Sequence, residues 1–324
     1  MKKDIKIKFV DFWNGFNYED FYIYKLLTSK YNVIISDYPD YIFYSVSGYN
    51  HLKYDCIRIF YTGENIRPNF NHCDYAMAFD YISFEDRYLR LPIYLALYRY
   101  LEIFEIALDK HYNEDNFKIR EKFCNMVVSN SLGDERLSFF KKLSDYKQVD
   151  SGGKTFNNVG GPVESKLEFQ KKYKFSMAFE NSSSNGYTTE KLVDAFASGG
   201  IPIYWGDPLV TNIFNPKAFI NANNFINEIE LIEFIKKMDT NDTLYLEFIK
   251  QPVLNDNDYL KKEQEKIENF IYKIFDEESS KAKRRSESLQ VIQEKRSLML
   301  VERILNLARP LLKIKSKIKN KLVK

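Results

Sequence analysis

Residues 174–208, KFSMAFENSSSNGYTTEKLVDAFASGGIPIYWGDP, read as a strand, a polar loop, a helix and a second strand. The first seven residues are mostly apolar, and the segment from Thr188 places apolar residues at helical spacing before a pair of glycines. Thr188 or Thr189 is a suitable N-cap, so the polar residues NSSSNGY predict a strand-to-helix loop. Such a loop lies at the carboxyl edge of a parallel sheet, where free backbone N–H groups and the helix dipole favour an anion.

Lys191 stands in the first turn of this predicted helix, where the dipole disfavours a cation by about 0.3–1 kcal/mol. A bound phosphate would reverse the sign of that contribution, and the adjacent Glu190 can accept hydrogen bonds from ribose hydroxyls. The pair therefore indicates a site for a sugar nucleotide. The site is not a P-loop, because neither GxxxxGK[ST] nor GxGxxG occurs in the chain. Considered alone, the loop is more simply an ordinary turn before a solvated lysine, and Glu190 is what favours the site.

The rest of the sequence predicts an α/β fold with two domains. With 324 residues, of which 44% are apolar, the chain is large enough to bury two cores. Strand-like runs occupy residues 5–13, 31–46, 55–65, 74–82, 124–130 and 149–154, and helical patterns occupy 18–30, 134–146 and 226–239. The domain boundary is expected within residues 100–122, and ligands of such proteins bind in the cleft between the domains.

Charge is distributed unevenly along the chain. The last 44 residues, 281–324, carry 14 basic and 3 acidic side chains, whereas the other 280 carry 34 basic and 42 acidic. The body is therefore not expected to bind nucleic acid, and the basic amphipathic tail suits an anionic membrane surface. A helix that docks on a partner protein, or a loose solubilising tail, is nearly as well supported.

The N-terminus and the cysteines predict a cytoplasmic location. No long apolar run follows Met1, so we expect neither a cleaved signal peptide nor an N-terminal membrane anchor. Three cysteines without close spacing argue against a disulfide framework and fit a reducing compartment. The tail would then meet the inner face of the cytoplasmic membrane.

Residues 179–210, FENSSSNGYTTEKLVDAFASGGIPIYWGDPLV, closely resemble the donor-binding motif of the bacterial inverting α1,3/1,4-fucosyltransferases. Upstream, FYTGENIRPNFNHCDYAMAFDY at 60–81 resembles the acceptor-side motif of the bacterial members. The resemblance implies a GT-B architecture, in which two Rossmann-like domains face each other across a cleft. The implied division is an acceptor-side domain at 1–115, a GDP-fucose-binding domain at 116–280 and the tail at 281–324.

The resemblance also assigns roles to individual residues. Positions that match donor contacts of the family are Arg136, Asn181, Tyr187, Glu190 and Lys191. Lys191 corresponds to the phosphate-contacting lysine, Arg136 to the arginine on the diphosphate, and Glu190 to a carboxylate expected on the ribose. Cationic side chains and helix N-termini would stabilise the departing GDP, so neither a metal ion nor a cofactor other than the GDP-fucose substrate is expected.

Glu64 corresponds to the family's proposed general base, and its simpler alternative is a cap or an ion pair with Arg67. The implied activity is inverting transfer of L-fucose from GDP-β-L-fucose to a GlcNAc or glucose hydroxyl of an N-acetyllactosamine or lactose-type glycan. Lewis-type lipopolysaccharide or capsule synthesis would use such a step. Two alternatives stay open: a GT-B transferase for another nucleotide sugar, and a non-catalytic glycan-binding protein on a degenerate transferase fold.

Overall fold

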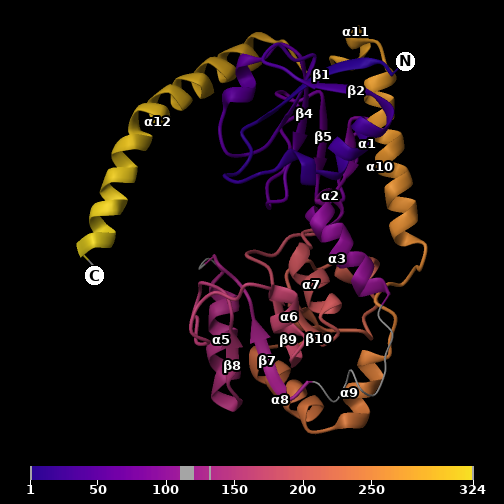
Figure 1. Cartoon of the computed structure of the whole chain (residues 1–324), viewed down its shortest axis with the longest axis vertical. Helices are drawn as coiled ribbons and strands as arrows, with labels where there is room; N and C mark the ends of the chain where they lie inside the picture. Colours follow the sequence, from indigo (N-terminus) through magenta and orange to yellow (C-terminus); the bar gives the residue numbers. More distant parts are fainter. Residues whose placement is uncertain (1, 110–119, 131–132, 323–324) are drawn as a thin grey trace. The chain divides into compact units, whose positions relative to one another are not determined.

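The computed structural model describes residues 2–109, 120–130 and 133–322. The chain divides into two compact units, each built on a parallel β-sheet (Figure 1). Unit 1 comprises residues 1–78, 82–90 and 267–324, and unit 2 comprises residues 79–81 and 91–266.

The sheet of unit 1 has the strand order β2-β1-β3-β4-β5-β6 in the described residues, and every pairing is parallel. Its strands are β1 (Asp4–Val10), β2 (Asn32–Ile35), β3 (Tyr41–Tyr44), β4 (Ile57–Tyr61), β5 (Tyr75–Ala78) and β6 (Tyr88–Arg90). Because β1 pairs with both β2 and β3, the strand order reverses at the β1/β3 pair, which is the topological switch point of the sheet. Ligands of open α/β sheets bind beyond the carboxyl ends of the strands at such a point.

The helices of unit 1 are η1 (Tyr18–Asp20), α1 (Tyr22–Lys30), η2 (Asn50–Lys53), α11 (Ser279–Ala282) and α12 (Leu289–Leu322), where η denotes a 3₁₀ helix, together with the end of α10 (Tyr259–Asp276). The predicted helix at 18–30 and the helical tail are present in unit 1, and η2, the end of α10 and α11 are additions to the prediction. The predicted strand at 31–46 is divided into β2 and β3 by the turn SDYPD, residues 36–40, since Pro and Asp favour turns over strand pairing. All residues of β3, β4 and β5 are buried, which explains their nearly continuous apolar runs.

Residues from Ile267 onward belong to unit 1 although they are remote from it in sequence. Phe275, near the end of α10, is fully buried, and its ring stacks on Tyr41 of β3 with centroids 4.3 Å apart. The next residue, Asp276, accepts a hydrogen bond from the Tyr31 hydroxyl at 2.6 Å. The C-terminal segment therefore completes the core of unit 1.

Two arginines after α11 fasten the chain to unit 1. Asp74, immediately before β5 and fully buried, accepts the backbone N–H groups of Arg284 and Arg285 at 2.6 and 2.8 Å, as well as the Arg285 guanidinium. Asp86 accepts a hydrogen bond from Arg284 Nη1 at 2.6 Å, and this contact, together with Lys273, lowers the pKa of Asp86 to about 2. The first arginines of the predicted tail, Arg284 and Arg285, are therefore paired with carboxylates of unit 1. A membrane or a partner protein would have to contact α12, the rest of the tail.

Helix α12 projects from the rest of unit 1, as Figure 1 shows in yellow. Its exposed face includes apolar side chains, among them Leu300, Ile304 and Leu307, which are 57%, 57% and 77% exposed. Within the described part of the chain, no helix combines the length and the apolarity that crossing a membrane requires.

The sheet of unit 2 has the strand order β11-β10-β9-β7-β8 in the described residues and is also parallel throughout. Its strands are β7 (Lys122–Met126), β8 (Val149–Ser151), β9 (Tyr173–Phe179), β10 (Ile201–Trp205) and β11 (Ile220–Asn221). Its helices are α2 (Ile93–Ala96), α3 (Tyr98–Leu108), α5 (Asp134–Tyr146), α6 (Lys166–Gln170), α7 (Glu190–Ala197), η3 (Val210–Asn212), η4 (Ala222–Asn224), α8 (Glu228–Asp239) and α9 (Asp242–Ile249), with the start of α10. Since β7 pairs with both β8 and β9, the switch point of this sheet is the β7/β9 pair.

Helices α5, α7 and α8 pack on the strands of unit 2. Phe139 of α5 stacks on Phe179 of β9 with centroids 5.0 Å apart, and Ile235 of α8 is fully buried in the same core. In α7, every residue from 192 to 197 is buried. This packing fixes the direction in which the connection between β9 and α7 leaves the sheet.

The two units differ from the predicted division of the chain. The predicted boundary between residues 115 and 116 lies outside the described residues, and the chain has already entered unit 2 after residue 90. Residues 267–280, predicted to belong with 116–280, are part of unit 1 instead, because the buried face of α10 packs there. Local periodicity identifies a helix but not the sheet on which it packs.

Candidate active site

The predicted donor-binding residues lie in two connections at the switch point of the unit 2 sheet. Arg136 is in the first turn of α5, which follows β7, and the other four lie between β9 and the first turn of α7. Because β7 and β9 are adjacent parallel strands, both connections leave the same edge of the sheet. The structure thus brings together two segments that are distant in sequence.

A buried carboxylate organises the start of α7. Glu180, the first residue after β9, is fully buried and accepts hydrogen bonds from Thr189 N at 2.7 Å, Thr189 Oγ1 at 2.8 Å and Lys191 Nζ at 3.0 Å. Thr189 is the N-cap of α7, as predicted, and its hydroxyl also accepts a hydrogen bond from Lys191 Nζ at 3.0 Å. The ammonium group of Lys191 is therefore held at the helix N-terminus, where an isolated cation would be disfavoured.

This cluster contains two carboxylates and one ammonium group. Glu190 Oε1 lies 3.6 Å from Lys191 Nζ. Burial alone would lower the pKa of Lys191, but Glu180 and Glu190 outweigh burial and raise that pKa, so Lys191 is cationic at neutral pH. Burial raises the pKa of Glu190, but Lys191 and then Lys166 outweigh it, and the net pKa is lowered. With 14% of its side chain exposed, Lys191 can still face a ligand.

The loop between β9 and α7 is held in one shape by Asp207, which follows β10. Asp207 is buried and accepts hydrogen bonds from Gly186 N at 2.7 Å and Thr188 Oγ1 at 2.9 Å. Gly186 has a φ of +84°, and a Cβ at this position would lie 2.6 Å from the carbonyl oxygen of Phe79. Only glycine fits this conformation and this space, so the loop is preorganised by its sequence.

Arg136 is buried against the loop, with 1% of the residue exposed. Its Nη1 donates hydrogen bonds to Asn181 Oδ1 at 2.8 Å and to the Phe179 carbonyl at 3.3 Å, and its Nη2 donates to the Asn130 carbonyl at 2.7 Å. Burial lowers the pKa of Arg136, but a guanidinium keeps its charge in proteins. Arg136 and Asn181, two of the predicted donor-binding residues, are thus in direct contact.

Tyr187 is also buried, at 2% exposure. Its ring packs edge-on against Phe79, with centroids 5.2 Å apart and an interplanar angle of 72°. The Tyr204 hydroxyl donates a hydrogen bond to the Tyr187 carbonyl at 3.4 Å. These contacts place Tyr187 in the packing that supports the loop, and its contact with a donor stays a prediction.

Glu64, the predicted general base, belongs to unit 1. It is exposed and lies in the loop after β4, at the carboxyl edge of that sheet. Thr62 Oγ1 accepts a hydrogen bond from Glu64 N at 3.0 Å, and Ile66 N donates to the Glu64 carbonyl at 2.7 Å. A tight turn therefore presents the Glu64 carboxylate to solvent, and its catalytic role stays a prediction.

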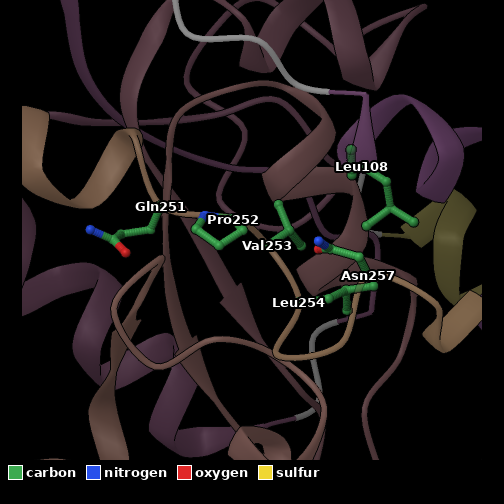
Figure 2. Close-up of a pocket in the computed structure, with 7 residues that line it drawn as sticks. Leu108, Gln251, Pro252, Val253, Leu254 and Asn257 are labelled. Carbon is green, nitrogen blue, oxygen red and sulfur yellow. The ribbon is translucent and has the colours of Figure 1, made fainter.

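Elsewhere, the described residues contain a pocket but no metal-binding cluster. The pocket, of about 210 Å³, lies between the end of α3 and residues 251–257 of unit 2, and Figure 2 shows the residues that line it. The side chains that line it are apolar apart from the amides of Gln251 and Asn257, so it lacks the cations that a diphosphate requires. In the same described residues, no group of three or more His, Cys, Asp or Glu side chains is placed to hold a metal ion. We therefore assign the candidate site to the switch point.

The sequence predicts no role for Glu180 or Asp207, yet these residues hold the site together. A signal for Glu180 was present, because a glutamate at the end of an apolar strand must find a partner if it is buried, and Lys191 lies in the first turn of the next helix. Asp207 gives no comparable signal, since the WGDP sequence reads as an ordinary turn.

The two parallel sheets, each with its switch point between its first and third strands, and the lysine at the helix start in unit 2 are the features of the GT-B fold of glycosyltransferases. A crystal structure of an α1,3-fucosyltransferase with GDP-fucose has this fold, with a TM-score of 0.68 and 30% sequence identity. The match covers 83% of this chain and 91% of that chain. The predicted α/β GT-B fold class is therefore confirmed.

The chain belongs to glycosyltransferase family 10, the fucosyltransferases. The family model for the C-terminal part of these enzymes matches residues 117–287, and the model for the N-terminal domain of α-(1,3)-fucosyltransferase FucT matches residues 7–98. The α-(1,3)-fucosyltransferase FucT of Helicobacter pylori is 33% identical over an alignment 284 residues long, and the alignment covers 75% of this chain and 59% of the relative. The putative fucosyltransferase R654 of Acanthamoeba polyphaga mimivirus is 38% identical over an alignment 143 residues long, and that alignment covers 40% of this chain and 24% of the relative.

The matched part of the chain includes the candidate site. The donor-binding residues lie within 117–287, and Glu64 lies within 7–98. The chain spans only 59% of the length of the Helicobacter pylori relative and less of the mimivirus relative.

Proposed function

We propose that this chain is an inverting α1,3-fucosyltransferase, which moves L-fucose from GDP-β-L-fucose to a GlcNAc or glucose hydroxyl of an N-acetyllactosamine or lactose-type glycan. The observation that carries the proposal is the cationic Lys191 at the N-terminus of α7, anchored by the buried Glu180 at the switch point of unit 2. Family membership and the similarity to a structure with GDP-fucose favour this donor over other nucleotide sugars.

The donor side of the proposed reaction must stabilise the departing GDP. When the bond between fucose C1 and the β-phosphate oxygen breaks, GDP takes the electron pair and gains negative charge. Lys191 and the backbone N–H groups at the start of α7 would offset that charge, and fixed groups of this kind need no reorganisation during the reaction. With these groups the proposed step requires no metal ion.

Three further donor-side residues have proposed roles that follow from their contacts. Glu190, whose pKa is lowered, is ionised and can accept hydrogen bonds from the ribose hydroxyls. The resemblance predicts Arg136 on the diphosphate, but Arg136 is 1% exposed and its guanidinium donates to the Asn181 side chain, so its proposed action on the donor is through Asn181. Tyr187 supports the loop that carries Asn181.

Glu64 is the proposed general base. It would take the proton of the acceptor hydroxyl as the acceptor oxygen attacks C1 from the face opposite GDP, so that the β-linked donor gives an α-linked product. An exposed carboxylate on a tight turn at the carboxyl edge of a sheet suits this role. A positioned base of this kind contributes about 10²–10⁴-fold to the rate.

We also infer a cytoplasmic location in which α12 contacts an anionic membrane surface. Leu300, Ile304 and Leu307 recur at three- and four-residue spacing and are exposed, and Arg296 and Arg303 on the same helix are exposed as well. An apolar stripe flanked by basic residues is typical of helices that lie on membranes. The product would then be a fucosylated glycan of the Lewis type, made for lipopolysaccharide or capsule at the inner membrane face.

Isothermal calorimetry with GDP and UDP, each with and without EDTA, tests the donor assignment. We expect binding of GDP that EDTA does not change, and weaker binding of UDP. A transfer assay with N-acetyllactosamine and lactose then tests the acceptor. Strong binding of UDP without binding of GDP would refute the fucose donor, whereas GDP binding without transfer to either glycan would refute only the acceptor.

A further inference from the structure

One carboxylate of helix α12 is buried although the residues around it are exposed. Glu302 is 2% exposed, whereas Val301 and Ile304 are 42% and 57% exposed. Its partners come from the loop after β3: Tyr49 N donates a hydrogen bond to Glu302 Oε2 at 3.2 Å, and Asn50 Nδ2 donates to Glu302 Oε1 at 3.3 Å. Because a buried carboxylate is costly unless it is hydrogen-bonded, Glu302 ties α12 to this loop.

Asn50 links Glu302 to a second buried carboxylate. Its Nδ2 also donates a hydrogen bond to Asp11 Oδ1 at 2.9 Å, and its Oδ1 accepts one from Lys53 Nζ at 2.6 Å. Both N–H bonds and the carbonyl of the amide are therefore used, and its partners define its orientation. Asp11 in turn accepts the backbone N–H and the Nδ1–H of His51, both at 2.8 Å.

This network lies at the switch point of unit 1. Asp11 follows β1, and residues 49–51 lie in the connection after the adjacent strand β3, which includes the start of η2. Asp11 has a φ of +56°, in the left-handed region where aspartate is among the few non-glycine residues found, and it accepts hydrogen bonds from His51 there. A Cβ at Gly48 would lie 2.7 Å from Asp11 Oδ1, so the loop packs directly on this carboxylate. The other neighbour of β3 is β4, whose loop carries Glu64 at the same edge of the sheet.

We propose that Glu302 is a positioning residue for the glycan acceptor, which acts by fixing the loop at residues 45–51 beside the Glu64 loop. The inference rests on the proposed function, since it requires that this edge of unit 1 receives the acceptor. It makes acceptor binding depend on the docking of α12. A surface or partner that pulls α12 away from Tyr49 and Asn50 would weaken acceptor binding, while GDP binding in unit 2 would not change.

The test is steady-state fucose transfer from GDP-fucose to N-acetyllactosamine by the full chain and by Glu302→Ala, Glu302→Gln and Gln293→Ala. Gln293 is an exposed residue of the same helix and serves as the matched control. We expect Glu302→Ala to raise the acceptor KM about tenfold, with kcat and the GDP-fucose KM within about twofold of wild type. Glu302→Gln should raise the acceptor KM about threefold, because its amide nitrogen meets one of the two N–H donors of the loop.

Hydrogen exchange of the Tyr49 amide gives a second measurement that does not depend on activity. Exchange should be faster in Glu302→Ala and unchanged in Gln293→Ala. Faster exchange with an unchanged acceptor KM would overturn the proposal, and so would an equal rise of the acceptor KM in Gln293→Ala. If Glu302→Ala does not fold, an acceptor KM for Glu302→Gln that equals the wild-type value would overturn it as well. A wild-type chain that binds GDP but transfers no fucose to either glycan would instead refute the acceptor part of the proposed function.

Discussion

Replacing Lys191 with methionine removes the ammonium group and with it two interactions, the buried ion pair with Glu180 and the proposed contact with GDP. Lys191 Nζ lies 3.0 Å from Glu180 Oε2, and Glu180 is fully buried. Removing one partner of a buried ion pair costs about 3–5 kcal/mol, because the other charge stays buried without compensation. Thr189 still donates hydrogen bonds to Glu180 in this variant. We therefore expect the free energy of unfolding to fall by about 3 kcal/mol, the lower end of that range. GDP binding should weaken by about 1.5–3 kcal/mol, which is about 10- to 150-fold.

The double variant Glu180→Gln with Lys191→Met separates the two effects. The neutral amide side chain that replaces the carboxylate of Glu180 needs no cation and can still accept a hydrogen bond from Thr189 N. The free energy of unfolding should therefore return to within about 1 kcal/mol of wild type. The GDP affinity should stay as low as in the single variant. Urea unfolding and calorimetry with GDP measure the two quantities, and a double variant that recovers GDP affinity would show that Lys191 only neutralises Glu180.

Lys166→Met is the matched control for this experiment. Lys166 Nζ pairs with Asp194 Oδ2 of α7 at 2.6 Å, so this substitution also removes a cation from a carboxylate of the same helix. It should lower the free energy of unfolding but change GDP affinity by less than about twofold, because Lys166 is not among the proposed phosphate contacts and Lys191, the larger cause of the lowered pKa of Glu190, is retained.

Glu64→Gln should keep the fold, keep GDP affinity within about threefold and lower the rate of fucose transfer at least about a hundredfold, because only proton acceptance is removed. Azide as the acceptor should restore part of this rate. Near-normal turnover without azide would assign the base to another residue. Arg284→Ala should lower the melting temperature at about pH 6, and the difference from wild type should shrink toward about pH 2. The reason is that the pKa of Asp86 is about 2 in the folded state, below its value in the unfolded state. The contribution of Asp86 to stability is therefore complete above the unfolded-state pKa and is lost as the pH falls through the folded-state pKa. A difference in melting temperature that persists at about pH 2 would exclude the charge of Asp86 as its cause. A chain that ends at Glu287 should bind GDP normally but no longer sediment with anionic vesicles, and equal sedimentation of the full and shortened chains would contradict the membrane role of α12.

Much of the candidate site was predictable because its signals are local. The helix at 134–146 occupies these residues in the structure, and residue type and helical spacing predict a cap at Thr188 or Thr189, of which the structure has Thr189. The place of Lys191 at a helix start after a buried strand follows from the same pattern. The strand order was not predictable from periodicity, so the alignment of the Arg136 and Lys191 connections at one edge emerged only from the structure.

The parts that escaped prediction are those fixed by long-range partners. Glu180 organises the site because Thr189 and Lys191 donate hydrogen bonds to it, and the sequence FEN does not show whether a glutamate at a strand end is buried with such a partner or exposed. Glu302 likewise looks like one more charged residue of a basic helix, and its hydrogen bonds with the loop at 49–50 lie far from it in the sequence. Side chains of this kind are defined by partners that a one-dimensional pattern does not contain.

The position at which the C-terminal segment can be shortened follows from the contacts of Asp74. This carboxylate is fully buried and Arg285 is nearly so, and Asp74 accepts donors from Arg284, Arg285 and Arg58. A chain that ends at Ala282 would leave Asp74 with Arg58 N as its main remaining donor. Breaking the buried pair of Asp74 and Arg285 would lower the free energy of unfolding by about 3 kcal/mol. Since a domain has only about 5–15 kcal/mol of stability in total, that loss would make unit 1 marginal. A chain that ends at Glu287 keeps the contacts of Arg284 and Arg285 with Asp74. A loss of vesicle binding or of acceptor affinity in that chain can therefore be attributed to α12 and not to unfolding.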